Sequence, residues 1–260
     1  TTVYLKGILP DVQFDNPKPI EFMKYLLKVS TLKDDIILDF FSGSGTTAHA
    51  TMLLNAEDVC NRKYIIVQLP EKLDEESEAY KFFKEKGKST NICEIGKERI
   101  RISGEKIKSD ETLPLENREK LDIGFKVFKL DSSNIKEWDS GAENLEEKLF
   151  DSTYNIKQDR SPLDILYEIL LKYGFDLNSQ IEEKNGYYSI NNGSLLIVLN
   201  EKIELESIYQ MCEEYKQKIK SDEKFEVKVV LRDNSFENDT DKANAIKILE
   251  QSGIKEIRSI

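Results

Sequence analysis

One segment of this chain combines glycines, hydroxyl groups and a carboxylate at a spacing that could bind a small ligand. It reads Asp39-Phe40-Phe41-Ser42-Gly43-Ser44-Gly45-Thr46-Thr47. Gly43 and Gly45 permit a tight turn and a close approach of the backbone to a ligand. A helix that starts after this turn would direct unpaired N–H groups at the bound molecule, which favours a negatively charged group there.

Two kinds of phosphate-binding loop do not fit these residues. A Walker A loop requires a lysine after its last glycine, whereas Gly45 is followed by Thr46. A dinucleotide fingerprint requires a third glycine three residues after the second, where this chain has Ala48. The segment therefore favours a ligand with one carboxylate and little other negative charge, such as a zwitterionic amino-acid nucleoside. The lone histidine, His49, is expected to be a packed core residue.

The elements around this segment predict an α/β fold. Residues 36–40 and 64–69 are apolar strand candidates, and a helix over residues 46–55 joins them, which predicts a right-handed βαβ unit with a parallel sheet. Pro19 is expected to open a helix that runs to about residue 29. Further helices are predicted over residues 75–86 and 96–108, a polar linker over residues 109–119, and a third strand of the same sheet over residues 124–130.

The pattern changes near residue 151, so we expect domains at residues 1–150 and 151–260. The second domain is predicted to contain a hairpin around Asn191-Asn192-Gly193, a strong turn signal. Its other predicted elements are helices over 162–173, 205–220 and 239–251 and strands over 225–231 and 255–259.

Composition limits the functional classes. A hydrophobic content of 39% with 33% charged residues fits a globular cytoplasmic protein, with no apolar run long enough to cross a membrane. Cys60, Cys93 and Cys212 are scattered, so neither a metal site nor a disulfide framework is expected. The net charge of −11 argues against this chain being the main DNA-binding surface of a nucleic-acid enzyme.

A family resemblance is carried by several motifs. The segment from Phe41 to Thr47 resembles motif I of the β-class amino-methyltransferases that act on DNA with S-adenosylmethionine, and Phe14-Asp15-Asn16-Pro17-Lys18-Pro19 resembles their motif X. Residues 36–55, 61–71 and 232–244 are similar to the modification (Mod) subunit of type III restriction–modification systems. The resemblance implies a partial Rossmann-like methyltransferase fold, the cofactor-binding half, in residues 1–150, followed by a smaller C-terminal α/β domain.

The same resemblance implies a set of cofactor-binding residues. Asn16, Lys18 and Pro19 would cover the methionine end of S-adenosylmethionine. Asp39, Phe40, Phe41 and Gly43 would line the pocket floor with Ser44 and Gly45, and Thr46 and Thr47 could add hydroxyl donors. An acidic residue normally holds the ribose after the second strand; here either Gln68 or Glu71 could do so. Asp131 is a weaker candidate for the adenine, and no metal ligand is expected.

The catalytic motif of these enzymes, Asp/Asn/Ser-Pro-Pro-Tyr/Phe/Trp, is absent because no two of the six prolines are adjacent. In the β-class order it precedes motif X, so it is expected upstream of Thr1, together with the target-recognition region. The chain is therefore interpreted as the C-terminal part of an adenine-N6 DNA methyltransferase subunit, inactive by itself. Cytosine N4 is the other possible target. The implied partners are DNA, a second Mod subunit and the restriction (Res) subunit. The alternative is a non-catalytic module for Mod dimerisation or Res docking.

Overall fold

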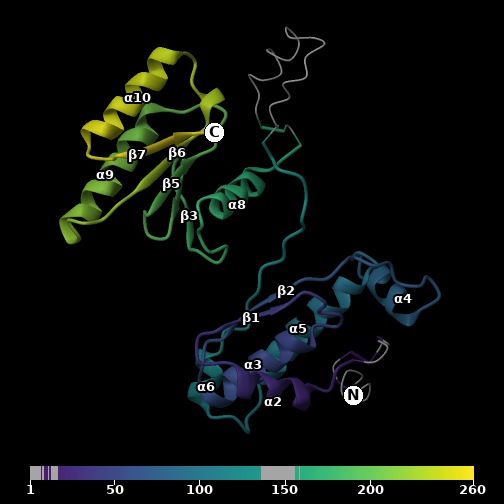
Figure 1. The fold of residues 1–260 in the computed structure, drawn as a ribbon. Coiled ribbons are helices and arrows are strands. Elements are labelled where there is room, and N and C mark those ends of the chain that lie inside the picture. Colours follow the sequence, from purple (N-terminus) through teal and green to yellow (C-terminus); the bar gives the residue numbers. More distant parts are fainter. Residues whose placement is uncertain (1–6, 8, 11, 13–16, 136–155, 158) are drawn as a thin grey trace. The chain divides into compact units, whose positions relative to one another are not determined.

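The computed structural model describes residues 7, 9, 10, 12, 17–135, 156, 157 and 159–260. The chain divides into two compact units, Thr1–Phe125 and Lys126–Ile260 (Figure 1). Both units combine helices with a sheet, as an α/β fold requires. The division lies between residues 125 and 126, earlier than the boundary near residue 150 that the sequence suggests.

The described part of the first unit contains a βαβ element with helices around it. Its elements are α2 (Ile20–Ser30), β1 (Ile36–Asp39), α3 (Thr46–Asp58), β2 (Lys63–Ile66), α4 (Glu78–Glu85), α5 (Ile92–Lys108) and α6 (Leu115–Lys120). The strands β1 and β2 pair in parallel, with Ile36 opposite Lys63 and Asp39 opposite Ile66. The predicted strand–helix–strand order and the parallel pairing are thus confirmed.

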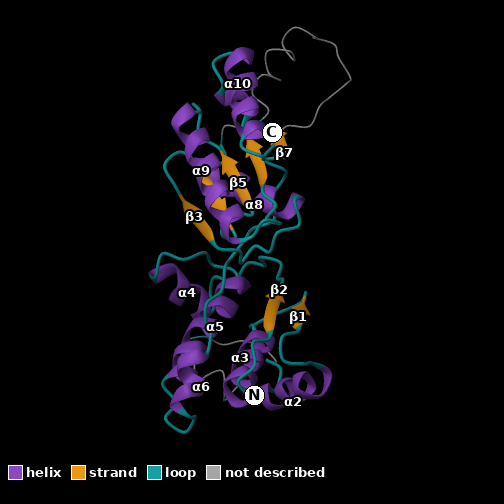
Figure 2. Cartoon of the chain, turned by 90° about the vertical axis from the view of Figure 1, so that its left-hand side faces the viewer, coloured by secondary structure: helices purple, strands orange, loops and turns teal. Residues whose placement is uncertain are grey.

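Helices cover one face of this sheet. Ile37 packs against Leu27 of α2 and Ala50 and Leu54 of α3, and Figures 1 and 2 show the helices gathered on one side of the two strands. The other face is apolar but uncovered. Its exposed fractions are 62% for Ile36, 60% for Leu38, 52% for Ile65 and 49% for Val67. Side chains alternate between the faces of a strand, which explains why one set is buried and the other is not.

The structure departs from the sequence prediction at α5 and at α6. Helix α5 begins at Ile92 rather than near residue 96, and the side chain of Asn91 caps it by accepting a 3.0 Å hydrogen bond from the N–H of Cys93. The expected polar linker over residues 109–119 is wrong in part, since α6 forms from Leu115. Asn117 ties α6 to the end of α3 by donating to the carbonyl of Ala56 at 2.7 Å.

The predicted third strand is also wrong. Residues 124–130 form no strand, and β1 and β2 make a two-stranded sheet within the described part of this unit. The apolar residues of this segment are instead divided between the units, because Phe125 packs against the core of the first unit and Phe128 belongs to the second. The ring of Phe128 packs edge-on against Tyr167 of α8 (Pro162–Lys172), with ring centroids 4.9 Å apart. Lys126 donates to the carbonyl of Leu177 at 2.7 Å.

The second unit holds a mixed five-stranded sheet, ordered β3-β4-β5-β6-β7 among the described residues. After α8 its elements are β3 (Ile181–Glu183), β4 (Tyr188–Ile190), β5 (Leu195–Val198), α9 (Leu205–Ser221), β6 (Lys228–Leu231), η1 (Asp233–Ser235), α10 (Asp239–Gln251) and β7 (Glu256–Ser259). The predicted hairpin is confirmed, because β4 and β5 are antiparallel. Asn191, Asn192 and Gly193 all have positive φ in its turn. The sequence pattern predicts neither β3 nor η1.

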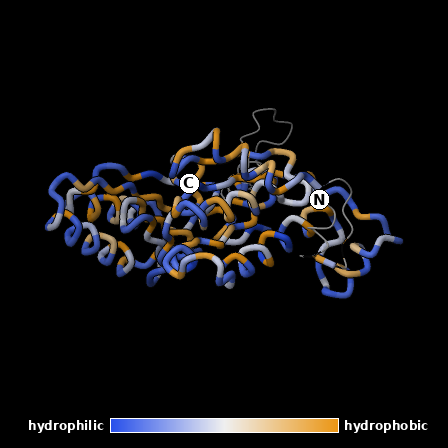
Figure 3. Tube along the Cα trace, turned by 90° about the horizontal axis from the view of Figure 1, so that it is seen from below, coloured by the Kyte–Doolittle hydropathy of each residue, from blue (hydrophilic) through white to orange (hydrophobic). Residues whose placement is uncertain are grey.

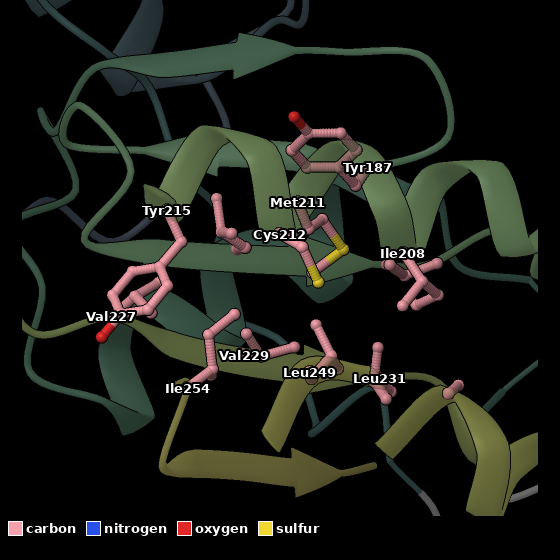
Figure 4. Close-up of a cluster of buried hydrophobic side chains, with 13 residues drawn as sticks. Tyr187, Ile208, Met211, Cys212, Tyr215, Val227, Val229, Leu231, Leu249 and Ile254 are labelled. Carbon is pink, nitrogen blue, oxygen red and sulfur yellow. The ribbon is translucent and has the colours of Figure 1, made fainter. Parts of the chain in front are cut away.

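Helices pack on both faces of this sheet. In β5, Leu195 and Ile197 face α8, whereas Leu196 and Val198 face the cluster formed with α9 and α10. Figure 4 shows the cluster formed with α9 and α10, in which Met211 of α9 lies among side chains of the strands and α10. Hydrophobic and hydrophilic residues interleave along the chain (Figure 3). None of the described helices has the length and apolar character needed to cross a bilayer.

Candidate functional site

The glycine-rich segment forms a tight turn between β1 and α3. Gly43 and Gly45 have φ values of 50° and 73°, in the left-handed region that favours glycine. The N–H of Gly45 donates to the carbonyl of Ser42 at 2.8 Å, and the N–H of Ser42 donates to Val67 after β2 at 3.2 Å. The turn is therefore fixed at the carboxyl ends of both parallel strands, where open α/β sheets usually bind ligands.

Helix α5 passes close behind this turn, backbone against backbone. A Cβ atom at Gly45 would lie 3.3 Å from the carbonyl oxygen of Gly96, and one at Gly96 would lie 3.4 Å from the carbonyl oxygen of Gly43. Three glycines thus meet where two segments approach. This contact explains why Gly96 lies inside a helix, a position that glycine otherwise destabilises.

The amino end of α3 has no cap of its own. Gly45 occupies the N-cap position without a side-chain hydrogen bond, and the first turn contains no acidic residue. The first N–H groups of a helix have no partner within the helix. Together with the helix dipole they form a site that favours an anion.

Asp39 stabilises the turn from the end of β1. Its carboxylate accepts a 2.5 Å hydrogen bond from the hydroxyl of Thr47 and a 3.1 Å bond from the N–H of Phe41. The Thr47 hydroxyl proton is therefore engaged within the protein. The rings of Phe40 and Phe41 lie 5.3 Å apart, and Phe41 is 79% exposed.

Gln68, just beyond β2, contacts the turn directly. Its side-chain oxygen accepts a 2.8 Å hydrogen bond from the N–H of Gly43. Glu71 is exposed, and its backbone carbonyl accepts from the N–H of Ile92 at the start of α5. The two ribose candidates therefore differ, since Gln68 already binds the turn and the Glu71 side chain faces solvent.

A buried polar network lies behind the turn. Arg99 of α5, only 2% exposed, donates from Nη1 to the hydroxyl oxygens of Ser44 at 2.9 Å and Thr46 at 2.7 Å. Its Nε lies 3.4 Å from Nδ1 of His49, which is also 3.1 Å from the hydroxyl of Ser103. Burial, followed by the charges of Arg99 and Lys106, lowers the pKa of His49 to about 3.

Sequence reasoning missed Arg99. It stands in a helix full of charged residues, and nothing in its spacing distinguishes it from its neighbours. The one available signal was Gly96, three residues earlier, because a glycine within a helix often marks a close approach. The expectation that His49 is a buried packing residue is confirmed, with 2% of its surface exposed.

The remaining candidates lie in different surroundings. Lys18 and Pro19 are exposed before α2, where Pro19 takes the N-cap position; Asn16 lies outside the described residues. Asp131 belongs to the second unit and forms a 2.7 Å ion pair with Arg160, whose hydrogen bond lowers the pKa of Asp131. Among the described residues no group of histidine, cysteine and acidic side chains could hold a metal ion.

The segment that carries this site resembles a known class of protein. Residues 6–105 include β1, the glycine turn, α3, β2 and nearly all of α5, and they match a family model described as DNA methylase. This segment is therefore similar to DNA methylases.

Individual relatives show which methylases the chain resembles. The chain is 40% identical over 119 residues to the type III restriction-modification enzyme StyLTI Mod subunit of Salmonella typhimurium, which is 46% of this chain and 17% of that subunit. It is 37% identical over 127 residues to the EcoPI Mod subunit of Escherichia phage P1, 49% of this chain and 18% of the relative. The type II methyltransferase M.KpnI of Klebsiella pneumoniae is 40% identical over 68 residues, 26% of this chain and 16% of its own length.

The resemblance to type III Mod subunits is thus confirmed. The chain matches less than a fifth of the length of each of these relatives.

Proposed function

We propose that this chain supplies the cofactor-binding half of a DNA methyltransferase of a type III restriction–modification system, which transfers a methyl group from S-adenosylmethionine to adenine N6. The observation that supports it is the glycine turn leading into the uncapped α3, within a segment similar to DNA methylases, in a chain that is similar to Mod subunits. In this proposal β1, α3 and β2 are part of a Rossmann-like fold, and the protein acts in the cytoplasm.

The turn fits the carboxylate of the cofactor. Gly45 has no side chain to cap α3, so its first N–H groups can bind a carboxylate. A negative group at a helix N-terminus gains about 0.3–1 kcal/mol when exposed and up to ~2 kcal/mol when partly buried. Micromolar affinity corresponds to about 8 kcal/mol. Further contacts must therefore supply most of the binding energy.

Other residues of this chain would provide those contacts. Asn16, Lys18 and Pro19 would hold the methionine end, and Asp39, Phe40 and Phe41 the pocket floor. We assign the ribose to Glu71, because the side-chain oxygen of Gln68 already accepts from Gly43 and an ionised carboxylate accepts from two hydroxyls more strongly.

The hydroxyls of Thr46 and Thr47 have different roles in this proposal. The Thr47 hydroxyl donates to Asp39, so it fixes the shape of the turn rather than contacting the ligand. The Thr46 hydroxyl accepts from Arg99 and keeps its own proton, which it can donate to the ligand.

When bound, S-adenosylmethionine supplies a methyl group activated by its sulfonium. The residues of this chain bind and orient it. Methyl transfer to a base flipped out of the duplex also requires groups that hold the target amino group. The chain contains no Pro-Pro motif to provide them. We therefore propose that the chain alone transfers no methyl group.

Nuclear magnetic resonance of the ¹⁵N-labelled chain tests the cofactor assignment. S-adenosylmethionine at millimolar concentration should shift the amide signals of Gly43, Gly45 and Thr46, because weak binding by a partial site is expected. ATP should leave them unchanged, since the turn has no phosphate-binding lysine. Shifts with ATP, or none with S-adenosylmethionine, would contradict the proposal.

The target base and the macromolecular partners come from the Mod similarity. A complete subunit that carries this segment should produce N6-methyladenine in its DNA; mass spectrometry that finds N4-methylcytosine instead would contradict adenine specificity. DNA should contact mainly other parts of that subunit, because this chain has a net charge of −11.

The alternative is that the second unit is an interaction module for a second Mod subunit or for the Res subunit. Its own two-sided core supports an independent role. Size-exclusion chromatography with and without residues 126–260 tests the dimerisation form of this alternative. An unchanged oligomeric state after the deletion would count against it.

A further inference from the structure

The guanidinium of Arg99 contacts three residues in the proposed cofactor turn and the start of α3. It donates to Ser44 and to Thr46, the residues on either side of Gly45, and it contacts His49 one helical turn further along α3. Arg99 is 53 and 55 residues away from Thr46 and Ser44 in sequence, so the link joins α5 to the turn through side chains. The turn thus depends on a residue outside its own motif.

The geometry favours arginine at this position. Arginine carries several N–H donors in one plane, which lets a single rigid group hold two hydroxyl oxygens and contact a ring nitrogen. Gly45, held between the two bonded residues, has the positive φ on which the turn depends. Gly96 lies against Gly45, so the backbone of α5 is held beside the turn about one helical turn before Arg99. This contact places the Arg99 side chain next to the turn.

The charge of Arg99 has a second consequence. The guanidinium lies at the hydroxyl of Thr46, the first residue of α3, so a positively charged group stands beside the positive end of the helix dipole. Arg99 is buried, and a buried charge is screened less by salt than an exposed one. A ligand carboxylate at the end of α3 would therefore be attracted by both the N–H groups and this charge.

We propose that Arg99 is a positioning residue of the cofactor site: it fixes the Ser44–Thr46 turn through two hydroxyls and adds positive potential for the carboxylate of an amino-acid nucleoside. The inference rests on the proposed function for its ligand, whereas the positioning of the turn is independent of any ligand. Its two parts are separable by experiment.

The first experiment uses the full chain without ligand. Amide hydrogen exchange at Gly45, whose N–H donates to Ser42, is compared in wild type, Arg99→Met, Arg99→Lys and the control Arg101→Met. Arg101 lies on the same helix but is 48% exposed and pairs with Glu98. Arg99→Met should accelerate exchange at Gly45 at least tenfold relative to amides of β2, and Arg101→Met should not. Equal acceleration across the whole unit would mean a general stability effect and would overturn the positioning role.

The second experiment compares two ligands that differ in the amino-acid tail. S-adenosylhomocysteine carries the carboxylate, and 5′-methylthioadenosine lacks it. Arg99→Met should weaken the first about tenfold and leave the second nearly unchanged, while Arg99→Lys, which keeps the charge, should recover part of the loss. Equal losses for both ligands would overturn the electrostatic role. If wild type binds neither ligand, the proposed function fails, and the exchange experiment still decides whether Arg99 positions the turn.

Discussion

The side-chain oxygen of Gln68 accepts a 2.8 Å hydrogen bond from the backbone N–H of Gly43, which joins the end of β2 to the start of the glycine turn. The bond bridges 25 residues of sequence and satisfies a backbone donor that the turn itself leaves unpaired. Gln68 thereby takes a structural role at the position where the family resemblance suggests a ribose contact.

Removal of this bond should loosen the first unit. We expect Gln68→Ala to lower its free energy of unfolding by about 1 kcal/mol, the usual net value of a hydrogen bond whose partner is left without an acceptor. Gln68→Glu keeps an acceptor and should stay close to wild type. Urea unfolding followed by signals of each unit measures both, with the second unit as the internal reference. A loss as large for Gln68→Glu as for Gln68→Ala would contradict this role.

Gly45 and Gly87 form a matched pair for testing the close approach of α5. Both have positive φ, 73° and 63°, but a Cβ atom at Gly45 would meet the backbone of Gly96, whereas one at Gly87 would meet nothing within 4 Å. Gly87→Ala should cost about 1–2 kcal/mol of stability from the left-handed backbone alone. Gly45→Ala should cost more, because α5 or the turn must also move. Equal losses in denaturant unfolding would show that the contact with Gly96 is unimportant.

The sequence predicted the local elements of this site well. Ile37 and its neighbours had strand character, and Gly43 and Gly45 had a spacing with a specific geometric meaning, so β1, the turn and α3 followed from short-range rules. The hairpin at Gly193 followed for the same reason, since its turn residues tolerate positive φ.

Long-range features could not be predicted in this way. Residues 124–130 alternate like a strand, but whether they pair depends on a neighbouring strand that no local pattern specifies. The hydrogen bonds of Arg99 to Ser44 and of Gln68 to Gly43 depend on how α5 and β2 pack beside the turn. Such contacts join residues that are distant in the sequence.

His49 should make the stability of the first unit depend on pH. Burial, with the charges of Arg99 and Lys106, lowers its pKa to about 3 in the folded chain, against about 6.5 when unfolded. Between these values the unfolded state binds a proton that the folded state does not, so stability falls as pH decreases from 6.5 towards 3 and is unaffected above 6.5. The slope is at most about 1.4 kcal/mol per pH unit.

This pH dependence can be assigned to one residue. His49 is the only histidine, so its ring signal in nuclear magnetic resonance is unambiguous, and it should not titrate between pH 7 and 5. The free energy of unfolding of wild type should be lower at pH 5.5 than at pH 7. The His49→Asn variant should show a smaller difference, because it lacks the titrating ring. Carboxylates add little in this range, since they are still largely ionised in both states. A ring that titrates near 6.5 would contradict the buried, neutral state.

The uncovered face of the β1–β2 sheet should cause the isolated chain to self-associate. Ile36, Leu38, Ile65 and Val67 place side chains that are about half or more exposed on one side of two adjacent strands. Contiguous apolar surface of this kind tends to be buried by association. Sedimentation velocity should therefore show oligomers that grow with protein concentration. Leu38→Lys should shift the chain towards monomer with little loss of stability, because it removes an exposed rather than a packed side chain. Leu171→Lys, which changes a residue of similar exposure (62%) on α8, should leave the association unchanged. If both variants weaken association equally, the contact does not depend on this face of the sheet.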